Sequence, residues 1–169
     1  MLVTARIDTS SQATESEHTM SGIEELVAGL TSSNNDEAYK CLQQLQSASA
    51  QNSAVYQYLE TLIDMLDSDN SYIRTRGALL ISANAKWDSD NRIDEIIDKY
   101  LKLIHDEKPI TARQCIQALP NIAWHKPDLA KSILFTLQQA IFSQYSVSMQ
   151  PLIAKDIQTV IHELQSVRG

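Results

Sequence analysis

The most constraining feature of this sequence is an internal repeat with a period of 37 residues, the separation between Trp87 and Trp124. The same shift superposes residues of equal or similar type along both units: Ile73 with Ile110, Arg76 with Arg113, Ala78 with Cys115, Leu79 with Ile116 and Asn84 with Asn121. Because Trp occurs only twice in the 169 residues, chance is a poor explanation of this register. A period of roughly 20–50 residues is typical of chains built from stacked supersecondary units.

Each unit has the apolar spacing of two amphipathic helices. The apolar residues recur three or four positions apart, for example at Val55, Leu59, Leu62 and Leu66, and again at Leu129, Ile133, Leu137 and Ile141. A period near 3.6 predicts helices with one buried face. Pro109 and Pro127 stand where Pro suits the first turn of a helix, whereas Pro120 falls inside a predicted helix and is expected to kink or shorten it.

The repeat extends more weakly toward both ends of the chain, which predicts an all-α protein of four helix pairs in one domain over residues 21–169. A single pair cannot bury its apolar face, so the pairs are expected to stack. Residues 1–20 are polar and lack a helical period, and we predict a disordered arm there. The predicted pairs cover about 21–49, 53–87, 91–124 and 127–167.

Composition excludes several other classes of protein. Four Gly and four Pro argue against a turn-rich all-β fold, and no apolar run approaches the roughly 18 residues of a membrane helix. The net charge of −7, with its excess acid in residues 1–52, does not favour nucleic acid as the default partner. Cys41 and Cys115 lie far apart among apolar residues, which predicts core thiols in a reducing compartment. Without a signal-peptide pattern at the start, we expect the cytoplasm.

The stretch LETLIDMLDSDNSYIRTRGALLISA (59–83) resembles a unit of the HEAT and armadillo class, with Asp67 or Asp69 and Arg74 at the family's Asp and Arg positions. The resemblance covers about 21–167 and implies a right-handed α-α superhelix, an α-solenoid of about four HEAT-like pairs. It also implies a concave face, lined by the second helices, that binds a protein or peptide. The segment DEKPITARQCIQALP is similar to small bacterial HEAT-like chains, for which the resemblance implies no particular activity.

The sequence carries no recognisable catalytic motif. It lacks GxSxG, a P-loop, GxGxxG and HExxH. None of its four histidines stands three or four residues from another His or from a Cys, so no metal-ligand spacing is present: His18, His105, His125 and His162. We therefore expect a protein that is not an enzyme and that uses no cofactor or metal.

Three arginines are candidate partner-binding residues: Arg74, Arg76 and Arg113. The last two occupy matched positions near the start of a second helix, where the helix macrodipole disfavours a cation unless something compensates. Two interpretations are open at this point. Asp69 or Asp106 pairs with these arginines inside the chain, or the guanidinium groups line the inner face and bind carboxylates of a partner.

Trp87, Trp124 and His125 are the other candidate binding residues, at the ends of the second helices. Indole rings there either pack the loops between units or anchor a partner at the edge of the inner face.

The leading hypothesis is therefore a non-catalytic interaction or scaffold module that binds a protein or peptide, acidic in the second interpretation of the arginines. The alternative is a nucleic-acid-binding HEAT-like protein related in architecture to alkylbase DNA glycosylases, although no large basic surface is evident. A third hypothesis is a self-associating piece, because an incompletely capped end can stack on a copy of itself. We expect a monomer or weak homo-oligomer that does not contact a membrane.

Overall fold

The computed structural model describes residues 22–167, and every regular element in that range is helical, which confirms the all-α class. The predicted arm at 1–20 lies outside the described residues. A helix over residues 22–29 opens the fold. The elements that follow are α2 (Asn35–Gln51), η1 (Val55–Tyr58), α3 (Leu59–Met65), α4 (Ser71–Ala83), η2 (Ala85–Trp87), α5 (Arg92–Leu101), η3 (Lys102–His105), α6 (Pro109–His125), η4 (Pro127–Leu129), α7 (Ala130–Gln138) and α8 (Gln150–Ser166).

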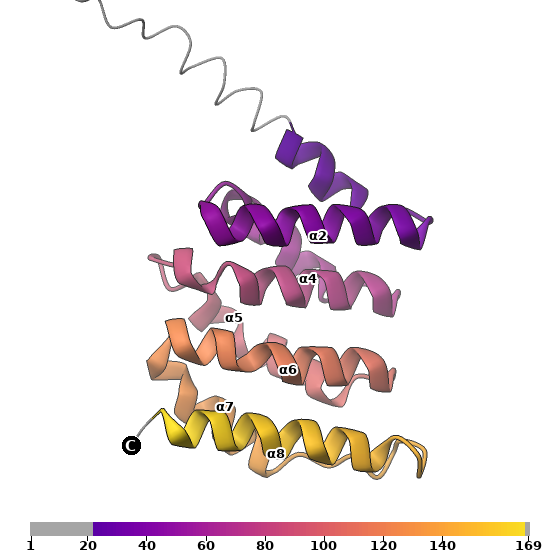
Figure 1. Cartoon of the computed structure of the whole chain (residues 1–169), viewed down its shortest axis with the longest axis vertical. Coiled ribbons are helices and arrows are strands. Elements are labelled where there is room, and N and C mark those ends of the chain that lie inside the picture. The colour runs from indigo at the N-terminus through magenta and orange to yellow at the C-terminus, as the bar shows by residue number, and fades with distance from the viewer. Residues whose placement is uncertain (1–21, 168–169) are drawn as a thin grey trace, which may run out of the picture.

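The helices form two layers (Figure 1). Helices α2, α4, α6 and α8 lie side by side in the front layer and run in the same direction, while α3, α5 and α7 lie behind them. Contacts follow this order, because α4 packs on α2 and α6, and α6 packs on α4 and α8. Each hairpin also packs on itself, as α3 does on α4 and α7 does on α8. The N-terminal ends of the front helices therefore share one edge of the layer, and their C-terminal ends share the other.

The core lies between the two layers and is continuous along the stack. Its residues come from the apolar stripes, and those of α6 recur at helical spacing: Ala112, Cys115, Ile116, Leu119 and Ile122. Gly77 marks a close approach of α4 to α3, because a Cβ atom there would lie 2.8 Å from the Leu62 carbonyl oxygen and 2.8 Å from Met65 Cβ. A larger residue would push α3 away from α4.

Local sequence signals explain where the helices begin. The side chains of Asn34 and Asn70 accept hydrogen bonds from the first amides of α2 and α4, and Pro109 begins α6 as predicted. Pro120 does not shorten its helix, because α6 continues to His125. A proline removes one internal hydrogen bond, and the packing of α6 against α4 and α8 compensates for that loss. None of the helices within 22–167 combines the length and apolar character needed to cross a membrane.

Candidate functional site

A groove of about 770 Å³ lies over the front helices α2, α4 and α6, toward their N-terminal ends. Three large side chains on its walls remain exposed to solvent, each from a different helix: Tyr39 at 56%, Tyr72 at 60% and Ile110 at 55%. Three large exposed side chains around one hollow make this groove the candidate binding site.

The polar lining of the groove is mainly basic or neutral. Arg76 and Lys108 contribute cations, Asp36 is the one carboxylate among the lining residues, and Thr75, Thr111 and Gln114 add hydroxyl and amide groups. Within residues 22–167 no three His, Cys, Asp or Glu side chains gather closely enough to hold a metal ion. The lining can therefore donate hydrogen bonds and contact apolar groups, but it offers no recognisable pair of acid and base for a reaction.

Arg76 lies in the groove with only 5% of its surface exposed. Its Nη1 donates to the Leu30 carbonyl oxygen at 2.9 Å and its Nη2 to Asn35 Oδ1 at 2.9 Å. The ring of Tyr72 covers the guanidinium carbon, with 5.8 Å from that carbon to the ring centroid. Desolvation by burial lowers the pKa of Arg76 from its ordinary value, and neither of its hydrogen-bond acceptors carries a negative charge that would offset this effect.

Arg74 precedes Arg76 on α4 by about 200° of helical rotation, so it faces the opposite way and binds within the chain. Its Nε and Nη2 donate to the two carboxylate oxygens of Asp106 at 2.7 and 2.8 Å, and its Nη1 donates to the carbonyl oxygens of Ser68 and Asp69. The pair is buried and links the second unit to the turn before α6. The hydrogen bonds that Arg74 donates to the Asp106 carboxylate raise the pKa of Arg74.

Arg113 also has an acidic partner inside the chain, in the next helix of the front layer. Its Nε donates to Asp156 Oδ2 at 2.6 Å, and its Nη2 lies 3.3 Å from Asp156 Oδ1. The expectation that Asp69 or Asp106 would pair with Arg76 or Arg113 is wrong. Asp106 instead binds Arg74, and Asp69 contributes only its backbone carbonyl oxygen. Arg113 binds Asp156. Which carboxylate lies nearest to each arginine depends on how neighbouring units are offset in space, and the repeat does not specify this offset.

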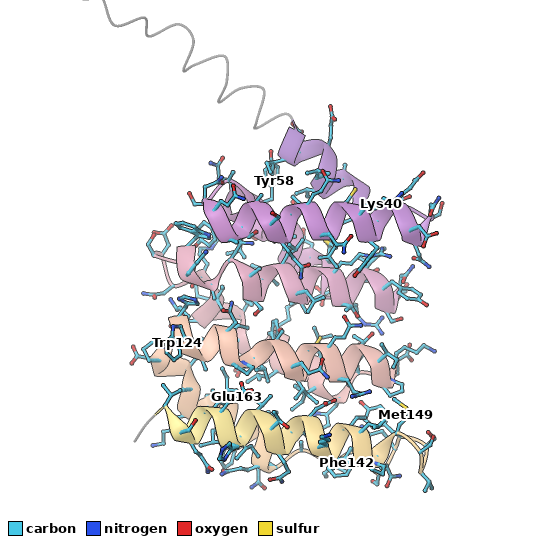
Figure 2. All side chains as sticks on the ribbon, in the orientation of Figure 1. Lys40, Tyr58, Trp124, Phe142, Met149 and Glu163 are labelled. Atoms are coloured by element: carbon cyan, nitrogen blue, oxygen red, sulfur yellow. The ribbon has the colours of Figure 1, made fainter. Side chains whose placement is uncertain are left out.

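The remaining candidates lie at the opposite edge of the front layer. Trp87 is half-buried and its Nε1 donates to the Ser49 carbonyl oxygen at 2.8 Å. Trp124 is 66% exposed, and Figure 2 shows it at the C-terminal end of α6. It borders a smaller apolar hollow of about 370 Å³ between α6 and the end of α8. His125 is exposed beside it, and desolvation and the charge of Lys86 lower its pKa.

Sequence reasoning missed the exposed groove residues Tyr39, Tyr72 and Ile110, and it also missed a buried ionic cluster. Asp88 is fully buried, accepts a hydrogen bond from Tyr56 and lies 3.0 Å from Lys126 Nζ, which also contacts Asp94 at 2.9 Å. Asp88 further accepts the first two amides of α5. Burial alone would raise the pKa of Asp88, but these hydrogen bonds lower it overall. The cluster holds units together and lies away from the groove.

Comparison with known proteins places the fold but not the function. No family model matches the chain, and no curated protein matches it. Among solved structures, an engineered protein determined by the Northeast Structural Genomics Consortium is similar, with a TM-score of 0.56 and 20% sequence identity. The match covers 85% of this chain and spans 62% of the engineered chain. The likeness therefore concerns the helical architecture alone.

Proposed function

We propose that this protein is a non-catalytic binding module that holds an extended or helical peptide segment of another protein in the groove over α2, α4 and α6. One observation carries the proposal, namely the convergence of Tyr39, Tyr72 and Ile110, all exposed, around a hollow of about 770 Å³. Exposed aromatic and aliphatic groups around a hollow are the usual anchors of an interface.

The finer architecture belongs to the same proposal. The 37-residue repeat and the shared direction of the front helices support a small α-solenoid of about four HEAT-like pairs with a right-handed superhelix. In that architecture the groove lies on the face made by the second helices of the units. Cys41 and Cys115 are both free thiols, which supports a cytoplasmic location.

A library of random peptides panned against the full chain tests this proposal. We expect enriched peptides that bind the wild-type protein and lose about tenfold in affinity on Ile110→Ser, because removal of a central apolar contact costs about 1.4 kcal/mol. Phe135→Ser is the matched control, since Phe135 is 64% exposed but lies outside the groove. Equal losses in both variants, or no enriched peptide, would exclude the groove as a binding site.

The enriched peptides can also be used to distinguish peptide binding from nucleic-acid binding. The groove proposal predicts that single-stranded and duplex DNA do not compete with the enriched peptides at low salt. Competition that weakens steeply as salt is added would instead favour the nucleic-acid alternative, because phosphate contacts release counterions.

A further inference from the structure

We propose that the groove recognises a carboxylate through Arg76, so that its partner segment carries an acidic group next to an apolar side chain. This inference rests on the proposed function and specifies the chemistry of the partner. It comes from a comparison of the three arginines on the front helices, which differ in what their guanidinium groups bind.

Arg74 and Arg113 present the same edge to a carboxylate. In each, Nε and Nη2 point to the two oxygens of one carboxyl group, Asp106 for Arg74 and Asp156 for Arg113. This side-on arrangement matches the planar fork of guanidinium to a carboxylate and is stronger than a bond between neutral groups.

On Arg76 the same edge lacks a carboxylate. Nη2 donates to the neutral amide oxygen of Asn35, and among the described residues Nε has no hydrogen-bond acceptor. The opposite end is fixed, since Nη1 donates to the Leu30 carbonyl oxygen, much as Arg74 uses its Nη1 on backbone carbonyls. The guanidinium group is thus held in place, and its Nε–Nη2 edge faces no carboxylate among the described residues.

Charge balance points to the same ligand. A buried cation is costly unless it is paired, and no Asp or Glu within residues 22–167 forms an ion pair with Arg76. Asn35 is exposed, so an incoming carboxylate can displace its side chain without opening the core. Lys108 adds a second positive charge to the groove, while Asp36 is the only acid that lines it.

The surroundings of Arg76 define what accompanies the acidic group. Arg76 is 5% exposed and the ring of Tyr72 lies over its guanidinium carbon, and a charged hydrogen bond is stronger at a site with little water. Tyr39 and Ile110 stand exposed on the neighbouring helices, where they can contact an apolar side chain beside the carboxylate. We therefore infer a peptide in which Asp, Glu or a terminal carboxylate adjoins an aromatic or aliphatic residue.

Matched peptides test this inference. Each groove-dependent peptide from the library is synthesised with its acidic residues intact and with the corresponding amides, Asp→Asn and Glu→Gln. A bond between charged groups contributes enough to predict a loss of about ten- to hundredfold in affinity for the amide form. The same loss is expected for the acidic peptide on Arg76→Met, and Arg113→Met is the control that leaves its affinity unchanged.

A gain of charge inside the protein provides a second test that does not depend on removing Arg76. Asn35→Asp places a carboxylate on the unfilled edge, at the first position of α2 where an acidic residue also suits the helix. We expect this variant to unfold at a higher temperature and to bind the acidic peptide about tenfold more weakly, because the internal carboxylate competes. If Arg76 had only a structural role, Asn35→Asp would raise the unfolding temperature without weakening peptide binding.

The two proposals fail in different ways. If the amide peptides bind as tightly as the acidic ones while Ile110→Ser still weakens both, the groove binds peptides and carboxylate recognition is wrong. If no peptide depends on Ile110, the proposed function itself fails. A direct readout is the Arg76 Nε–H signal in NMR spectra, which should shift on addition of N-acetyl-phenylalanine and not of its amide. A shift with both compounds would overturn the inference.

Discussion

The units at 53–87 and 91–124 carry the same residue types at matched positions and use them differently. Trp87 is half-buried and bound to the Ser49 carbonyl, whereas Trp124 is 66% exposed. Arg113 binds a carboxylate of the following helix, whereas Arg76 binds neutral acceptors from the preceding unit. Adjacent units, rather than the repeat itself, therefore decide whether a repeated side chain stabilises the stack or remains available to a ligand.

The position after each Trp gives the clearest contrast, and with it the largest expected effect. The 37-residue shift matches Asp88, fully buried and paired with Lys126, to the exposed His125. We expect Asp88→Asn to lower the free energy of unfolding by about 3 kcal/mol at pH 7, because Lys126 loses its buried partner. His125→Asn should change that free energy by less than about 0.5 kcal/mol. Urea unfolding followed by circular dichroism measures both.

The pH dependence sharpens the same comparison. Asp88 has a lowered pKa in the folded protein, so its contribution is present above its ordinary pKa of 3.8 and is lost as the pH falls through the folded value. The difference in free energy of unfolding between wild type and Asp88→Asn should therefore decrease below about pH 4. The pKa of His125 is lowered from 6.5, so any destabilisation from its protonation begins below that pH. If the difference in free energy of unfolding between wild type and Asp88→Asn stayed constant down to about pH 2, the assigned pairing of Asp88 would be contradicted.

The two tryptophans should differ by a smaller amount. Trp87→Phe removes the hydrogen bond to the Ser49 carbonyl and should cost about 1–2 kcal/mol of stability. Trp124→Phe should cost less than about 0.5 kcal/mol, because the ring is largely exposed. Since the chain has two Trp, each variant leaves one reporter. Iodide should quench the fluorescence of Trp124 strongly and that of Trp87 weakly, and the reverse order would refute this placement.

The smallest expected effect concerns the matched arginines. The Arg113–Asp156 pair is partly exposed, so Arg113→Met should cost about 0.5–1 kcal/mol at low salt and less in 1 M NaCl, where charges are screened. Arg76→Met should respond less to salt, because no carboxylate partner is lost. Thermal unfolding at two salt concentrations compares the variants. An equal salt response in both would indicate that Arg76 has an acidic partner inside the chain.

Much of the fold could be predicted from the repeat and the apolar stripes, because a stack of helix pairs must bury one face of every helix. The interpretation of Pro120 failed in part, since the helix α6 runs through it to His125. Tertiary packing on both sides outweighs the local cost of a proline, and such packing is invisible in a local pattern.

The site was less predictable, because the repeat directs attention to residues that recur, whereas the two tyrosines of the groove have no counterpart of their own type in the neighbouring unit. The 37-residue shift places Tyr39 opposite Arg76 and Tyr72 opposite Pro109, so neither tyrosine is marked by the repeat. Ile110 is matched to Ile73, yet Ile73 packs against the core whereas Ile110 is 55% exposed. Exposure at such positions depends on the offset between neighbouring helices, which one sequence does not reveal.

The groove crosses two interfaces between front helices, α2–α4 and α4–α6, and this has a mechanical consequence. Among residues 22–167, the hairpin formed by residues 22–29 and α2 packs on the stack from one side, so we expect this terminal hairpin to open more readily than the central units. A ligand bound across α2, α4 and α6 would contact all three helices and so stabilise both interfaces. Part of its binding free energy would then appear as slower hydrogen exchange in that first hairpin, so occupancy of the groove and cohesion of the stack are coupled.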